Sequence, residues 1–176
     1  MKQLAFFVFM LSLLSLVACG DDDDTAFGCI ELDYQEPEYL EDVNFIEITN
    51  TPTVQIERFV SANNLDTVHT PSGLVYSIID AGEAEKPEAG AVVEVWYKEY
   101  LANGSIFAQS NVCSTGPLRA TLNIRTLAWQ EGVRNVGRGG KIMLLARPSL
   151  AFGSSSPSSN SFIVVSEVEL LDFENL

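Results

Sequence analysis

The chain has 176 residues, of which 24 are acidic and ten basic, giving a net charge of -14. This length suits one domain with some additional segments, and 47% apolar residues are enough to bury a core. The acidic surplus argues against nucleic acid as a partner, since phosphate binding requires a basic face. One histidine and three cysteines exclude a multi-histidine metal site and a disulfide-dense scaffold. We expect no metal, no cofactor and no chemical role for His69.

Residues 1–18 are predicted to be a signal peptide. Lys2 gives a positive start, and the apolar run from Leu4 to Ala18 is shorter than the roughly 20 residues that span a bilayer. The sequence at 16–20, Leu-Val-Ala-Cys-Gly, resembles the lipobox of bacterial lipoproteins. That resemblance implies cleavage before Cys19, lipidation of its sulfur and anchoring to the outer membrane. The alternative is an ordinary secretory signal with a chance cysteine at its boundary.

Residues 19–50 are predicted to form a flexible acidic tether. From Asp21 to Asp42 there are ten acidic residues and no basic one, and like charges at this density repel one another and extend the chain. The Asp run at 21–24 also resembles a surface-export signal of some Gram-negative lipoproteins. The domain is therefore expected either in the periplasm or exposed on the cell surface. Whether Cys29 and Cys113 form a disulfide in that oxidising compartment is left open.

Residues 51–69 are predicted to form an N-terminal helix and a connector. The Asn-Thr-Pro sequence at 50–52 is typical of a helix start, with a capping side chain followed by proline in the first turn. Ile56, Phe59 and Val60 then form an apolar stripe. We expect this stripe to dock on the domain that follows, the alternative being a dimerisation helix.

Residues 70–176 have the pattern of one α+β domain built mostly of antiparallel strands. Val92–Leu101 alternates apolar and polar side chains, and the Asn-Gly pair at 103–104 is a strong hairpin signal. One helix is predicted over Thr126–Arg134. Further strands are expected over Gly73–Ile79, Ser105–Ala108, Ala120–Ile124, Lys141–Arg147 and Phe162–Phe173.

Six motifs in this domain resemble those of FKBP-type peptidyl-prolyl isomerases. They are Val-Trp-Tyr at 95–97, the turn and strand at 103–107, Trp-Gln-Glu-Gly-Val at 129–133, Gly-Gly-Lys at 139–141, Pro-Ser-Leu-Ala-Phe-Gly at 148–153 and the closing strand at 168–172. Each motif alone is a weak signal, but six in order at the right spacing are specific. The match runs from about Thr70 to Phe173. It implies an antiparallel sheet of five to six strands wrapped around one short helix.

The same resemblance implies an aromatic pocket between the helix and the concave face of the sheet. A substrate proline ring is expected to lie against a tryptophan there. By position, the pocket residues are Trp129 as the floor, Tyr97 and Phe107 as walls, Phe152 at the mouth, and Leu118, Thr126 and Ser166 as further substrate-binding residues.

The resemblance implies a peptidyl-prolyl cis-trans isomerase acting on exported proteins. The barrier to rotation about an X–Pro bond, about 18–20 kcal/mol, arises from amide resonance that is lost in the twisted transition state. A dry apolar pocket favours that less polar state without a nucleophile, an acid or a metal.

Three departures from the family predict reduced activity and weak binding of the family's macrolide inhibitors. Ala108 stands where the family usually has Asp, Phe152 where it has Tyr, and Ser166 where it commonly has Phe. The alternative function is a non-catalytic chaperone or protein-binding module on the same fold. In either case we expect a lipid-anchored monomer whose partners are proline-containing polypeptides.

Overall fold

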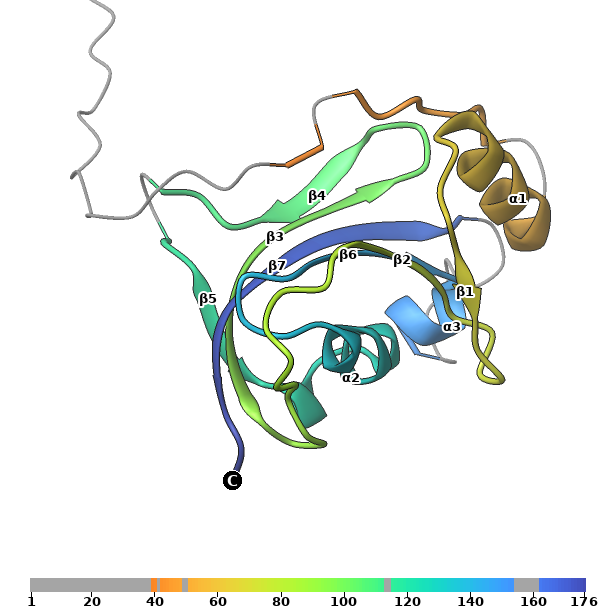
Figure 1. Ribbon diagram of the computed structural model, residues 1–176. Helices are drawn as coiled ribbons and strands as arrows, with labels where there is room; N and C mark the ends of the chain where they lie inside the picture. The colour runs from red at the N-terminus through yellow and green to blue at the C-terminus, as the bar shows by residue number, and fades with distance from the viewer. Residues whose placement is uncertain (1–38, 41, 49–50, 113–114, 154–161) are drawn as a thin grey trace, which may run out of the picture.

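The computed structural model describes residues 39–40, 42–48, 51–112, 115–153 and 162–176. The predicted signal peptide, Cys19, most of the tether, Cys29 and Cys113 lie outside these ranges. Within them, a strongly curved antiparallel sheet wraps around a short helix, and a second helix lies on the sheet's other side (Figure 1). The predicted fold class is therefore confirmed, with seven strands in the sheet. No helix in the described part of the chain is long and apolar enough to cross a membrane.

The strands follow the predicted order closely. They are β1 (Val68–His69), β2 (Val75–Asp80), β3 (Val92–Leu101), β4 (Ile106–Gln109), β5 (Leu118–Thr121), β6 (Lys141–Ala146) and β7 (Val164–Glu174). Their order in the sheet is β1-β2-β6-β7-β3-β4, and β5 also pairs with β3. The strand expected over Ala120–Ile124 is wrong in its bounds. It starts at Leu118 and ends at Thr121, where Leu122 turns into the core and begins a 3-10 turn.

Strand β3 organises the sheet. It pairs with β7 along its whole length on one side and with β5 and then β4 on the other. Its alternation places Val93 and Val95 on the concave face, where they are almost completely buried. The face that the sequence predicted to be apolar is thus the face that encloses the short helix.

That enclosed helix is α2 (Leu127–Gly132), followed by a 3-10 turn (Val133–Asn135). Thr126 is its N-cap, and the Thr126 hydroxyl accepts a hydrogen bond from the Trp129 backbone N–H at 3.3 Å. Gly132 ends α2 against β6, where a Cβ atom would overlap the Leu144 side chain. A third helix, α3 (Pro148–Ala151), was not predicted and leads into Phe152.

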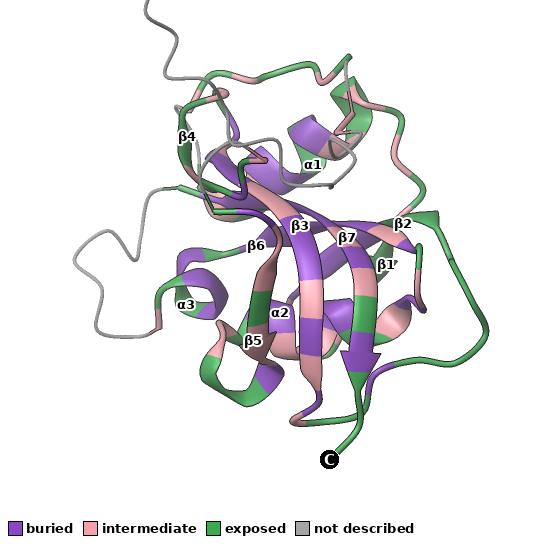
Figure 2. Ribbon diagram, turned by 90° about the vertical axis from the view of Figure 1, so that its left-hand side faces the viewer, coloured by how far each residue is buried: buried purple, intermediate pink, exposed green. Residues whose placement is uncertain are grey.

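Helix α1 (Pro52–Ala62) covers the opposite face of the sheet, as the docking prediction required. Phe59 and Ile56 pack there against Met143 and Val165 in a second core. Both faces of the central strands are therefore buried, which Figure 2 shows as purple ribbon between α1 and α2. Thr51 is the N-cap of α1, but its side chain makes no capping hydrogen bond, so that part of the prediction is wrong.

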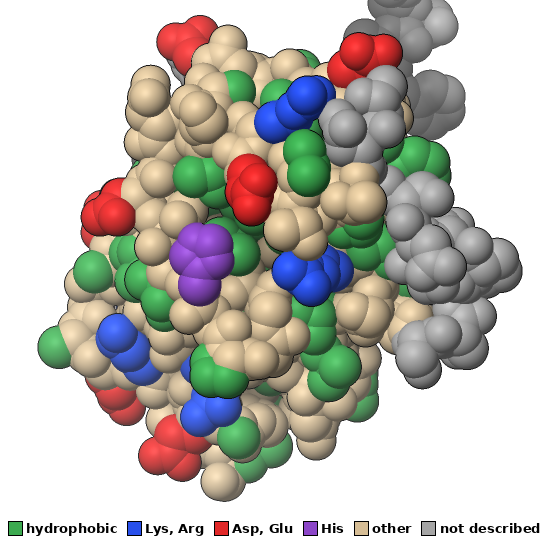
Figure 3. Space-filling view, turned by 90° about the vertical axis from the view of Figure 1, so that its right-hand side faces the viewer, with side chains coloured by type: hydrophobic (Ala, Val, Ile, Leu, Met, Phe, Trp, Pro, Cys, Tyr) green, Lys and Arg blue, Asp and Glu red, His purple; other side chains and the backbone are tan. Residues whose placement is uncertain are grey.

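The lone histidine is exposed, in the two-residue strand β1. Figure 3 shows it on a face where single charged side chains of both signs are separated by other groups.

Candidate active site

The centre of the predicted site is Trp129, whose indole is fully buried between α2 and the sheet. The Tyr97 ring meets it edge to face, with ring centroids 5.4 Å apart and planes at 77°. Such a pairing suits the electron-rich face and electron-poor edge of aromatic rings. The indole Nε1–H donates a 2.8 Å hydrogen bond to Glu99 Oε1. The structure thus brings together the predicted floor and one predicted wall, and adds a carboxyl group that was not predicted.

Glu99 lies between two of the positions where the chain departs from the family. In the sheet it faces Ala108 of β4 on one side and Ser166 of β7 on the other. The Ser166 hydroxyl donates to Glu99 Oε1 at 3.0 Å, and both side chains are buried. Small side chains at both neighbouring positions leave room for the glutamate. The wall at Ser166 is therefore occupied by a hydrogen-bonded carboxyl group.

A signal for Glu99 was present in the sequence. Side chains two residues apart on a strand share a face. Glu99 follows Tyr97 by two residues and is therefore expected on the pocket face. An acidic residue there is unusual enough among buried positions to mark a site.

Arg125 is a second residue that the sequence analysis missed. Its guanidinium carbon lies 4.6 Å from the centroid of the Trp129 ring, a cation–π arrangement. Its Nε atom is buried and has no hydrogen-bond partner among the described residues. In this conformation Arg125 covers one face of the indole. Nothing in the sequence distinguishes this arginine from an ordinary surface residue before a helix.

Two cavities lie next to the residues that contact the indole. One, of about 320 Å³, is lined by Arg125, Thr126 and Phe152 together with Leu150. The other, of about 180 Å³, is lined by residues that include Tyr97, Pro117 and Leu118. Each is large enough for a proline side chain, whereas a bound water takes about 30 Å³. Trp129 itself lines neither cavity.

Phe107 and Phe152 form a second aromatic pair at the edge of the site. Their ring centroids are 6.0 Å apart, and each side chain is nearly half exposed. Exposed aromatic rings at adjacent loops and strand ends are suited to hold an extended peptide. Of the seven predicted pocket residues, Tyr97 contacts Trp129, Leu118 shares a cavity with Tyr97, and Thr126 shares one with Phe152. Ser166 reaches Trp129 only through Glu99.

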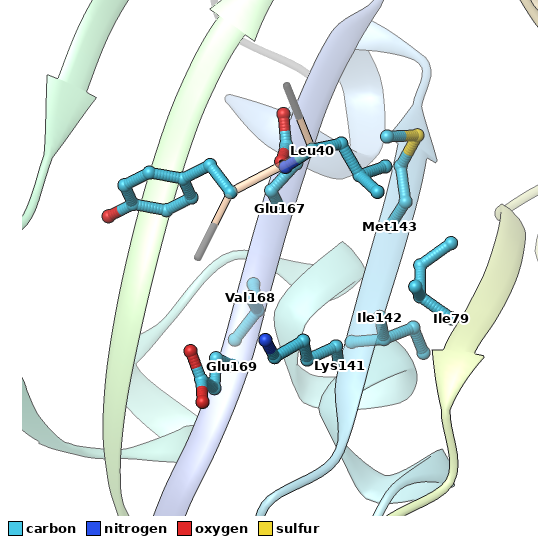
Figure 4. A pocket seen from close by; sticks show the side chains of 9 residues that line it. Leu40, Ile79, Lys141, Ile142, Met143, Glu167, Val168 and Glu169 are labelled. Atoms are coloured by element: carbon cyan, nitrogen blue, oxygen red, sulfur yellow. The ribbon is translucent and has the colours of Figure 1, made fainter. Parts of the chain in front are cut away.

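The opposite face of the sheet has a smaller cavity, of about 30 Å³, shown in Figure 4. Ile79 and Met143 contribute apolar side chains to it, and Leu40 of the N-terminal segment closes part of it. This volume holds about one water molecule. It is therefore too small for a proline ring, and the candidate site is on the concave face.

The N-terminal segment is nevertheless tied to the back of the site. The Tyr39 hydroxyl donates to the Tyr97 carbonyl oxygen at 2.8 Å, and the Leu40 N–H donates to Glu167 Oε2 at 2.9 Å. Burial raises the pKa of Tyr39 to about 12, so this hydroxyl stays protonated and able to donate at neutral pH. No group of three or more metal-ligating side chains exists among the residues that the structure describes.

A family model described as FKBP-type peptidyl-prolyl cis-trans isomerase matches residues 83–173. The chain belongs to that family. The match covers β3 to β7 and α2, and therefore every residue of the candidate site. All six motifs that resemble the family lie within the matched residues.

Curated relatives share the family's description. The FKBP-type peptidyl-prolyl cis-trans isomerase FkpA of Escherichia coli K12 is 37% identical over 119 residues, which are 66% of this chain and 43% of FkpA. FkpA of Buchnera aphidicola subsp. Schizaphis graminum is 38% identical over 111 residues, 61% of this chain and 43% of that protein. The matched part of the chain thus spans less than half the length of these relatives.

Solved structures show the same fold. The crystal structure of FkpA from Escherichia coli superimposes with a TM-score of 0.61 and 32% identity, over 70% of this chain and 58% of that one. A peptidyl-prolyl cis-trans isomerase from Pseudomonas syringae pv. tomato gives a TM-score of 0.57 at 23% identity, over 70% of this chain and 92% of that one. The second likeness bears on the fold alone.

Removal of the Arg125 side chain should expose the Trp129 ring. We expect Arg125→Ala to increase acrylamide quenching of Trp129 fluorescence, measured in a Trp96→Phe background that leaves one indole. Arg134→Ala, an exposed arginine just beyond α2, removes the same charge without touching the ring and serves as the control. Equal quenching in the Arg125 and Arg134 variants would show that the arginine does not cover the indole in solution.

Proposed function

We propose that the chain is a peptidyl-prolyl cis-trans isomerase that acts on X–Pro bonds of exported proteins. The observation that carries this proposal is the pair of proline-sized cavities beside Tyr97, Thr126 and Phe152, next to residues that contact the Trp129 indole. Membership of the family supports the reaction, and the geometry supports its place on the molecule.

The proposed mechanism is stabilisation of the twisted amide by a site with little water. Tyr97, Phe107, Trp129 and Phe152 supply aromatic surface around the bond that rotates. The planar amide loses water contacts in such a site, whereas the twisted amide, which is less polar, loses less. The site therefore raises the free energy of the planar amide more than that of the twisted amide, and this difference lowers the barrier to rotation.

Access to the indole requires Arg125 to move. Its guanidinium rests on the Trp129 ring, and a cation–π contact of this kind is worth about 0.5–2 kcal/mol. A substrate proline ring that displaces the Arg125 guanidinium packs on the indole, while the guanidinium returns to water. Because the cation–π contact is lost in this exchange, the substrate binds more weakly than it would to an uncovered indole.

Reduced activity is part of the proposal. Ala108 offers no side-chain hydrogen bond to a substrate, and Phe152 lacks the hydroxyl of the family's tyrosine. Ser166, in place of the family's phenylalanine, leaves that wall wider and more polar. A polar wall favours the planar amide and so reduces the differential stabilisation on which the rate depends.

A non-catalytic chaperone or binding module is the second candidate. The observation that favours it is the covered Trp129 ring, since the exposed Phe107 and Phe152 pair can bind apolar peptide segments without the indole. The two functions differ in catalysis, because only the isomerase accelerates cis-trans isomerisation of an X–Pro bond.

The purified chain should accelerate cis-trans isomerisation of an X–Pro peptide in a protease-coupled assay. Phe152→Ala should lower kcat/KM by roughly three- to tenfold, because it removes one ring of the exposed pair. Val68→Ala in β1 removes an exposed apolar side chain far along the chain from the site and should leave the rate unchanged. A wild-type rate equal to the uncatalysed rate would contradict the isomerase and favour the binding module.

We also propose that the protein is a monomer anchored to the outer membrane through lipid on Cys19. The lipobox-like sequence at 16–20 and the acidic stretch after it support this placement. Diacyl and further acyl chains together give stable anchoring. Cys19→Ser should release the protein from the membrane fraction into the soluble fraction, while Cys113→Ser should not. Full retention of the Cys19 variant in membranes would exclude the lipid anchor.

A further inference from the structure

The buried carboxyl group of Glu99 has no role in the mechanism described so far. It comes from the middle of β3, and only 8% of the residue's surface is exposed. It contacts the floor of the site directly, through the 2.8 Å hydrogen bond from the Trp129 indole. A buried acidic residue is costly unless hydrogen bonds compensate it, so its presence at this position calls for a function.

We propose that Glu99 is a positioning residue of the isomerase site, which fixes the orientation of the Trp129 ring for the proline. This inference rests on the proposed function. Glu99 acts through the indole rather than on the rotating bond itself. Its effect is to hold the ring plane in one orientation.

The geometry supports this role from three sides. Oε1 accepts from both Trp129 Nε1 and Ser166 Oγ, so the carboxyl joins α2 to β7. Tyr97, two residues earlier on the same strand, packs edge-on to the same indole. Arg125 covers the ring face but leaves the ring edge to Glu99. The indole is therefore held at its edge by β3, while the Arg125 guanidinium lies over one of its faces.

The alternatives available to a buried indole N–H show why the contact matters. Without Glu99, this donor would be buried and unsatisfied, or the ring would rotate to find another acceptor. Hydrogen bonds to a charged acceptor are stronger than neutral ones. Ala108 and Ser166, the cross-strand neighbours of Glu99, are both too short to replace it from their own strands.

The chain offers a direct spectroscopic readout. It has two tryptophans, Trp96 and Trp129, so a sample labelled with ¹⁵N in the indole gives two N–H signals. Trp96 provides the internal reference. The variants are Glu99→Gln, which keeps an acceptor oxygen, and Glu99→Met, which fills the space without one. Glu94→Gln removes an acid from the same strand without touching the indole and is the control.

We expect Glu99→Met to move the Trp129 signal upfield, to speed hydrogen exchange of that indole, and to lower kcat/KM about tenfold. Glu99→Gln should keep the Trp129 signal, its hydrogen-exchange rate and kcat/KM close to those of the wild type. Glu94→Gln should leave all three unchanged. Rescue by the amide is the outcome that a merely space-filling role does not give. If Glu99→Met proves unstable, the Trp129 signal and activity of Glu99→Gln are compared with those of Glu99→Ser, which is small and reaches no indole.

An unchanged Trp129 signal in Glu99→Met would overturn the positioning role, as would equal activity of the folded Met and Gln variants. A wild-type chain that does not accelerate cis-trans isomerisation would contradict the proposed isomerase function instead. In that case, the indole signal and the affinity for a proline-mimetic ligand still decide whether Glu99 positions the ring.

Discussion

The structure depends on the burial of one indole against a curved sheet. Trp129 is the residue through which α2 contacts β3, and Thr126, Tyr97, Glu99 and Arg125 each interact with it by a different force. Capping fixes the helix start, the aromatic edge and carboxyl fix the ring, and the guanidinium covers its face. The same contacts that stabilise the domain therefore define the proposed site, so a change in one affects both stability and binding.

The sheet divides the protein into two sides with different tasks. The concave side encloses α2, while the opposite side is covered by α1 together with Leu40, Val43 and Ile46. Tyr39 donates to the carbonyl of Tyr97, so the N-terminal segment supports the strand that carries the site from behind. Leu40, Val43 and Ile46 thus pack on the second core, and the tether over residues 19–50 stays a prediction.

The fold was predictable because its signals are local and repeated. Alternation in β3, the Asn-Gly hairpin and the spacing of six motifs each indicate the same architecture. The site was predictable only as far as the motifs reach. Its place two residues after Tyr97 puts Glu99 on the pocket face, but its partner Ser166 is 67 residues away and pairs with it only in the folded sheet. Arg125 was missed because no pattern shows that a lone arginine will lie on a ring four residues ahead.

The central claim is that the Trp129 ring is the surface on which a substrate proline lies once Arg125 moves aside. The most direct test is to titrate the chain with a soluble proline-mimetic ligand and follow the two indole N–H signals and the Arg125 side-chain signal. We predict that the Trp129 and Arg125 signals shift together with one saturation curve while the Trp96 signal stays fixed. Saturable binding that leaves Trp129 and Arg125 unmoved would contradict it.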